Sequence, residues 1–174
     1  MTGLPPELER MLSDNPSLEH LRQIYEYITK SNDEFDLGKV ITCSAYAEYF
    51  LERLLRTFLR SAKETDEIVK KIGPNFSSRV KFAYSMNLFA EQIKDQLLFV
   101  AEVRNEFAHN KDASFDDQGV GDICDRYRSL ISDGGGERNL AIFINASTPA
   151  LMSLCKSIEV VQTMRASTFP NSMK

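Results

Sequence analysis

Three side chains near the middle of the chain have the chemistry needed to break a phosphodiester bond: Arg104, Asn105 and His109. An imidazole can take the proton of a ribose 2′-hydroxyl or give one to the leaving oxygen, because histidine titrates near neutral pH. The planar guanidinium group of an arginine can neutralise the charge on a phosphorane-like transition state. On a helix, Asn105 and His109 share a face, so the amide could orient the imidazole. These residue types are suited to RNA cleavage.

The same residues also fit a purely structural role. Arg104 continues an apolar helical stripe, which predicts a partly buried guanidinium that needs an acidic partner, either Glu48 or Glu52. The stripe consists of Ile93, Leu97, Val100 and Ala101. His109 lies in the last turn of the same predicted helix, where a protonated imidazole interacts favourably with the helix C-terminus. In this interpretation the segment is a structural staple, and both interpretations stay open.

A basic ridge is the second feature that could contact a nucleic acid. Its members recur at spacings of three and four on one predicted helix: Arg53, Arg56, Arg60 and Lys63. Such a ridge could follow a phosphate backbone. Acidic residues lie among them, which is more typical of a solvated helix face, and the nearest aromatic residues, Tyr46 and Tyr49, lie one or two turns earlier. The ridge is therefore a weak candidate for nucleic-acid binding.

Composition narrows the remaining classes of function. The chain has 174 residues and a formal net charge of −4, so only a local basic patch could attract a polyanion. Cys43, Cys124 and Cys155 are widely spaced and accompanied by two histidines, so we expect neither disulfides nor a zinc site but three buried thiols. We expect no metal, no cofactor and no membrane span, and a cytoplasmic location. The glycine-rich phosphate loop and the nucleophile elbow of common enzymes are not in the sequence.

Apolar residues at three-and-four spacing predict helices along nearly the whole chain. The predicted helices cover about residues 6–14, 17–30, 36–62, a short charged stretch that ends at 73–75, a segment capped by Ser77 or Ser78, and then 90–109, 120–131 and 137–165. In the long third helix the expected core stripe is Ile41, Ala45, Leu51, Leu54, Leu55 and Phe58. The helix after Ser78 is expected to carry Val80, Phe82, Ala83, Met86 and Phe89. The pattern is that of an all-α, single-domain bundle of about seven to eight helices.

The residues at helix ends and between helices allow further predictions. Asn110 is expected to close its helix in the left-handed conformation, and Pro149 to kink the last helix or to start a second one. Residues 133–136 are the best candidate hinge. We divide the chain into an N-terminal short helix (1–15), a helical domain (16–166) and a flexible tail (167–174).

The last helix has more apolar residues than one packing face needs, which favours a homodimer: Leu140, Ile142, Phe143, Ile144, Leu151 and Leu154.

Three blocks, in order, resemble the mannitol operon repressor family. They are residues 36–41, which open the long helix, residues 76–84, and residues 103–109 followed by 114–117. The resemblance spans about residues 18–165, and the chain departs from it at 85–89, where the family has a turn of small residues and glycine. It implies an all-helical protein linked to transcriptional repression. Since no helix-turn-helix is visible, we expect a repressor of this kind to act through a protein partner, and direct reading of DNA is not expected.

The segment from Arg104 to His109 also resembles the signature of HEPN-type helical nucleases, an arginine followed by asparagine and, after three more residues, by histidine. That resemblance implies a homodimer in which two motifs line a shared cleft and cut RNA without a metal. Some toxins of that superfamily carry a modified tyrosine two places after the histidine, where this chain has Lys111. Two hypotheses follow: a regulator that acts through protein contacts, and a metal-independent ribonuclease that uses Arg104, Asn105 and His109.

Overall fold

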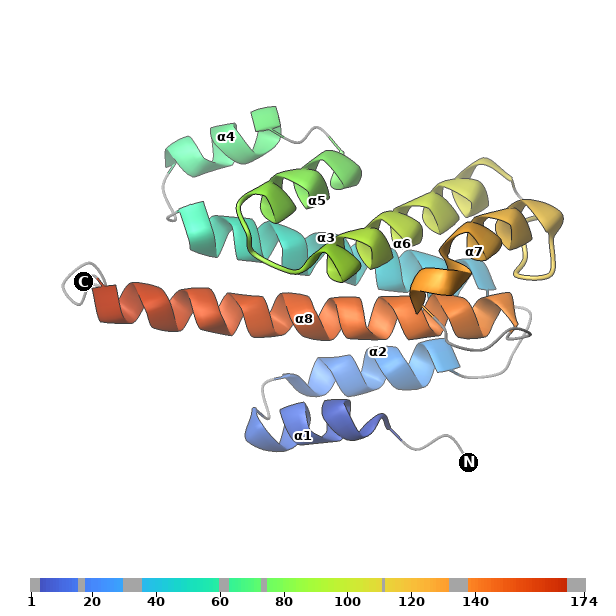
Figure 1. Ribbon diagram of the computed structural model, residues 1–174, viewed down its shortest axis with the longest axis horizontal. Coiled ribbons are helices and arrows are strands. Elements are labelled where there is room, and N and C mark those ends of the chain that lie inside the picture. The colour runs from blue at the N-terminus through green and yellow to red at the C-terminus, as the bar shows by residue number, and fades with distance from the viewer. Residues whose placement is uncertain are drawn as a thin grey trace.

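The computed structural model describes residues 4–15, 18–29, 36–59, 63–72, 75–110, 112–131 and 138–168, and within these ranges it contains eight helices and no strand (Figure 1). The helices are α1 (Pro6–Asp14), α2 (Glu19–Thr29), α3 (Asp36–Leu59), α4 (Lys63–Ile72), α5 (Phe76–Ser85), α6 (Glu91–His109), α7 (Gln118–Ile131) and α8 (Asn139–Thr168). The prediction of an all-α bundle of about seven to eight helices is confirmed. The predicted hinge at 133–136 and residues 169–174 of the predicted tail lie outside the described residues.

Helix α8 is the axis of the bundle. It runs the length of the molecule, with α1 and α2 on one side and α3, α5 and α6 on the other (Figure 1). The core is one continuous cluster of buried apolar side chains, to which even the short α1 contributes Leu8 and Leu12. Three phenylalanines, Phe50, Phe99 and Phe143, are almost fully buried at its centre. Burial of side chains of this size is the main source of stability in such a bundle, at about 1.5–3 kcal/mol each.

The register of α3 differs from the prediction. Leu51, Leu54 and Leu55 are buried as expected, but Ile41 is 53% exposed and Ala45 is also exposed. The core face of the first half of α3 is instead formed by Val40, Cys43, Ala47 and Phe50. Adjacent residues on a helix point about 100° apart, so choosing Ile41 over Val40 rotated the predicted stripe away from the core. An apolar side chain is therefore left on the outer face of α3.

Two helix ends also differ from the prediction. Helix α5 is capped by Asn75, whose side-chain oxygen accepts a hydrogen bond from the backbone N–H of Ser78 at 2.9 Å, so neither serine is the cap. The helix ends at Ser85, and the chain turns through Asn87, which has a φ of +57°. Asn110, by contrast, is extended with a φ of −115°, so the left-handed asparagine was predicted at the wrong helix end. Asn87 makes the left-handed turn in the segment where the chain departs from the family it resembles, because asparagine tolerates this conformation.

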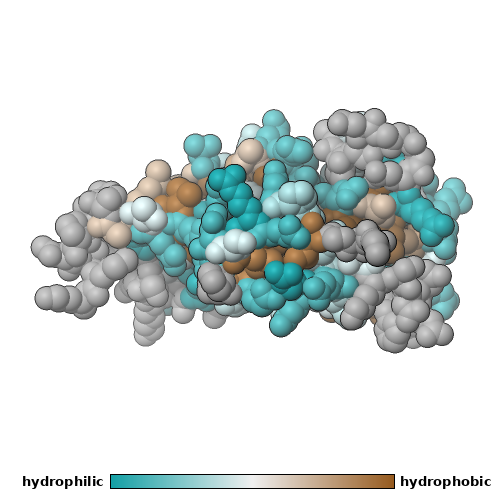
Figure 2. Space-filling view, turned by 90° about the horizontal axis from the view of Figure 1, so that it is seen from below, coloured by the Kyte–Doolittle hydropathy of each residue, from teal (hydrophilic) through white to brown (hydrophobic). Residues whose placement is uncertain are grey.

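Pro149 lies inside α8, which continues through it as a single helix of 30 residues. The helix is long and apolar enough to cross a membrane by length and composition, but 56% of its most apolar window is buried by other helices, as in the core helix of a soluble protein. The face seen in Figure 2 is largely hydrophilic, with apolar surface confined to patches. Ile142, Phe143 and Leu154 are buried within the monomer, so they offer no free surface for self-association.

All three cysteines are buried and free, as predicted. Burial raises the pKa of the Cys43 and Cys155 thiols to about 12 and that of Cys124 to about 11. Raised thiol pKa values keep these groups neutral at physiological pH, where they pack as small apolar side chains.

Replacement of Asn87 tests the turn between α5 and α6. We expect Asn87→Gly to fold with unchanged or slightly higher stability, and Asn87→Val to lower the free energy of unfolding by about 1–2 kcal/mol, since a β-branched residue is strained at positive φ. The matched control is Asn110→Val, at an extended position where valine is unstrained. Urea unfolding followed by circular dichroism measures both, and equal losses at the two positions would contradict this account of the turn.

Candidate functional site

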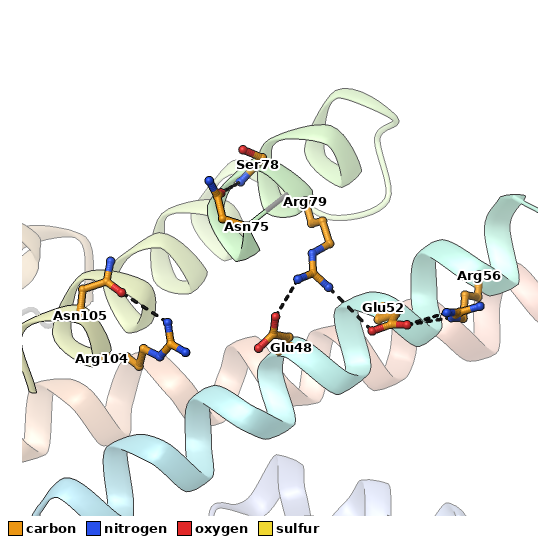
Figure 3. Close-up of polar contacts among 8 residues, drawn as sticks. All are labelled: Glu48, Glu52, Arg56, Asn75, Ser78, Arg79, Arg104 and Asn105. Atoms are coloured by element: carbon orange, nitrogen blue, oxygen red, sulfur yellow. Dashed lines mark hydrogen bonds and ion pairs between the residues drawn. The ribbon is translucent and has the colours of Figure 1, made fainter. Parts of the chain in front are cut away.

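Arg104 and Asn105 line a hollow of about 240 Å³ at the junction of α3, α5 and α6. Its lining comprises Ser44, Glu48, Asn75, Phe76, Ser77, Val100, Ala101, Arg104 and Asn105. The floor is formed by α6 through Val100 and Ala101, and the rim is polar. Arg104 is exposed, and its Nη1 donates a hydrogen bond to the side-chain oxygen of Asn105 at 3.5 Å (Figure 3). The guanidinium group is thus available to a ligand.

The prediction that Arg104 is a partly buried staple on Glu48 or Glu52 is wrong. Both carboxylates are bound by Arg79 of α5, which reaches across to α3 at 2.7 Å from Glu48 and 3.7 Å from Glu52 (Figure 3). The Arg79 side chain is only 16% exposed. Arg79 faces α3 at the place where the two glutamates are one turn apart, so it takes the partners that were expected for Arg104.

His109 lies in the last turn of α6, as predicted, and is exposed. No hydrogen bond or ion pair joins its ring to another residue in the described part of the chain, and it does not line the Arg104 hollow. Asn105 was predicted to orient the imidazole, but its side-chain oxygen faces Arg104 instead. Arg104 and His109 are five residues apart, which places them about 140° apart around α6 and about 7.5 Å apart along it. The two side chains therefore leave the helix in different directions.

Helix α7 packs against the side of α6 that carries Glu102 and Glu106. Glu102 accepts hydrogen bonds from Arg126 at 2.5 Å and from the Tyr127 hydroxyl at 2.9 Å. Burial, together with the hydrogen bond to Glu102, raises the pKa of Tyr127 to about 12, so the phenol remains a donor. One turn on, a Cβ at Gly119 would come within 2.8 Å of a Glu106 carboxylate oxygen, so a larger residue there would have to displace the Glu106 side chain. These contacts set the orientation of the exposed motif.

The start of α3 lies beside the loop that follows the motif. The Asp36 carboxylate accepts a hydrogen bond from the backbone N–H of Phe115 at 3.2 Å and pairs with the buried Lys39 ammonium at 3.3 Å. This contact joins the first turn of α3 to the segment after His109. It places two exposed apolar side chains of α3, Leu37 and Ile41, at the same end of the molecule as the motif.

The basic ridge is described only in part. Arg53 is exposed, and Arg56 pairs with Glu52 at 2.7 Å. Arg60 lies outside the described residues, as does the side chain of Lys63. Sequence reasoning missed Arg165 of α8, which joins these residues in a second hollow of about 580 Å³ lined by Tyr49, Glu52, Arg53, Arg56, Thr57 and Arg165. More than one hundred residues separate Arg165 from the ridge, so no local pattern could have placed it there.

No family model, no curated protein and no solved structure matches the chain. The resemblances to the mannitol operon repressor family and to HEPN-type nucleases therefore stay predictions. In the described residues, no three histidine, cysteine, aspartate or glutamate side chains gather in a way that could hold a metal ion.

A pair of alanine substitutions distinguishes the two arginines. We expect Arg79→Ala to lower the free energy of unfolding by about 1–2 kcal/mol, because Glu48 loses its cation and Glu52 keeps only Arg56. Arg104→Ala should change stability by no more than about 0.5 kcal/mol, as at other exposed positions. Guanidinium unfolding measures both, and a larger loss for Arg104→Ala than for Arg79→Ala would restore the staple interpretation.

Proposed function

We propose that this chain is a metal-independent endoribonuclease whose catalytic pair is Arg104 and His109. The observation that supports the proposal is that all three motif side chains are exposed while the nearby carboxylates are bound by Arg79. A structural staple at this motif needs a buried Arg104 and a bonded His109, but Arg104 is exposed and the His109 ring has no hydrogen bond or ion pair within the described residues. An exposed arginine at a hollow can bind a phosphodiester, and an exposed histidine is free to act on a substrate held by another chain.

The reaction follows from the two side chains. A neutral His109 imidazole takes the proton of the ribose 2′-hydroxyl, and the 2′-oxygen attacks the adjacent phosphorus. Arg104 binds the non-bridging oxygens, whose charge increases in the transition state. The bond to the 5′-oxygen breaks, this oxygen takes a proton from solvent, and the protonated His109 gives the proton it took back to solvent. The products are a 2′,3′-cyclic phosphate and a 5′-hydroxyl, so water is not consumed in this step.

The proposal includes a homodimer, because one chain directs Arg104 and His109 to different sides of α6. A second copy that meets the first near the end of α6 can bring its histidine to the phosphate held by the arginine of the first. Leu37 and Ile41, which are 45% and 53% exposed at this end of the molecule, are the apolar side chains that such a contact would cover.

A regulator that acts through protein contacts is the second candidate, and a different surface favours it. Met86, Val160 and Met164 are exposed around an apolar groove of about 630 Å³ between α8 and the turn after α5. Flexible methionine side chains suit a groove that receives an apolar segment of a partner. This candidate is the one expected from the resemblance to the mannitol operon repressor family.

RNA cleavage in the presence of EDTA tests the nuclease. We expect wild-type protein to cleave single-stranded RNA to products with 2′,3′-cyclic phosphate ends, and Arg104→Ala and His109→Ala each to lose at least about 100-fold in rate while keeping their helicity. Arg10→Ala, an exposed arginine of α1, is the control and should cleave like the wild type. If the folded wild-type protein cleaves none of several RNAs, the nuclease proposal is wrong and the regulator is the better account.

Mixed dimers test whether the site is shared. Arg104→Ala and His109→Ala chains carrying different affinity tags can be co-expressed and purified through both tags. If each site takes arginine from one chain and histidine from the other, one of the two sites is intact, and we expect roughly half of the wild-type activity. If each chain uses its own pair, no site is intact and the mixed dimer is inactive, which would refute the shared site.

A further inference from the structure

The outer face of α3 leads from the Arg104 hollow into the second hollow. Glu48 lines the first hollow, and its neighbour Tyr49 lines the second, followed by Arg53 one turn on. The two hollows are therefore adjacent along one helix. A chain molecule that lies in both hollows would have to pass round α3, because Glu48 and Tyr49 are consecutive helix residues and point about 100° apart.

Charge distinguishes the second hollow from the rest of this acidic protein. Three arginines line it against a single carboxylate, Glu52, which is bound by Arg56 at 2.7 Å. The exposed Arg53 side chain has no hydrogen bond or ion pair within the described part of the chain; only its backbone carbonyl accepts one, from the Thr57 hydroxyl. Arg165 reaches over from α8 and donates a hydrogen bond to the backbone carbonyl of Thr57, which fixes its guanidinium group beside α3. Positive charge here is held in place by two helices.

Tyr49 supplies an aromatic surface at the entrance to this hollow. Its side chain is 57% exposed, the highest value among the tyrosines of the described residues. The ring is supported at one edge by the buried Phe50, with centroids 5.3 Å apart and planes at 65°. A supported ring with a free face next to arginines is the arrangement on which the bases of single-stranded nucleic acids stack.

We propose that the second hollow binds single-stranded RNA beside the phosphate to be cut, with a base stacked on Tyr49 and the backbone phosphates held by Arg53 and Arg165. This inference rests on the proposed function, since it assumes an RNA substrate at Arg104. It specifies that the substrate is single-stranded, because the base faces of a duplex are already stacked on one another and cannot reach Tyr49.

Binding is measured on full-length protein carrying His109→Ala, so that RNA is not consumed, by the fluorescence anisotropy of a short labelled oligouridylate. We expect Tyr49→Ala in this background to weaken binding about tenfold, and Tyr49→Phe, which keeps the ring, to bind like the parent. Arg53→Gln should weaken binding and lower the slope of log affinity against log salt by about one. Arg10→Gln, the same change on α1, is the matched control and should have no effect.

The outcomes separate this inference from the proposed function. If the wild-type protein cleaves RNA but Tyr49→Ala and Arg53→Gln bind like the parent, the inference is overturned and the nuclease stands. If the variants lose binding as expected but the wild type cleaves nothing, the nuclease falls and the RNA-binding hollow stands. Equal competition by duplex RNA, or loss of binding in Arg53→Gln without loss in Tyr49→Ala, indicates attraction of any polyanion or acidic peptide and also overturns the inference.

Discussion

The contact between Arg79 and the two glutamates of α3 governs the rest of the candidate site. It joins α5 to α3 and, together with Arg56 on Glu52, pairs both carboxylates with cations; Glu48 lines the Arg104 hollow and Glu52 the second hollow. Each carboxylate is more than one third exposed, so the direct gain in stability is modest. Its larger effect is electrostatic. With both carboxylates paired, the anionic substrate that we propose would meet less repulsion at Arg104 and Arg53 on a protein whose net charge is −4.

Much of the fold could be predicted because amphipathic helices reveal themselves through local periodicity. Helices α1, α6 and α7 begin and end within about two residues of their predicted bounds, and the three cysteines are buried as expected. The prediction of which side of α3 faces the core was wrong, because periodicity does not fix the rotation of a helix about its own axis. On α3 both Val40 and Ile41 are apolar, and only the positions of α6 and α8 decide which of them faces inward.

The sequence predicted which residues could belong to the candidate site, but it did not predict how their side chains lie relative to one another. Arg104, Asn105 and His109 were named from their types and spacing, yet the exposure of Arg104 depends on Arg79, which nothing in the local pattern connects to Glu48. The same holds for Arg165, which joins the basic hollow only because α8 runs beside α3. Asn87 is a smaller case of the same kind. Asparagine is permitted in a left-handed turn after either α5 or α6, and the local sequence does not distinguish Asn87, which adopts it, from Asn110, which does not.

The place of α8 in the chain has a consequence for how the protein is made. It is the last of the described helices to be synthesised, yet it packs against α2, α3, α6 and α7 and forms the axis around which they gather. Until it leaves the ribosome, the apolar faces of the earlier helices lack the partner that covers them. We therefore expect the bundle to close only after synthesis of α8, and a nascent chain waiting at that stage to be the form most in need of a chaperone.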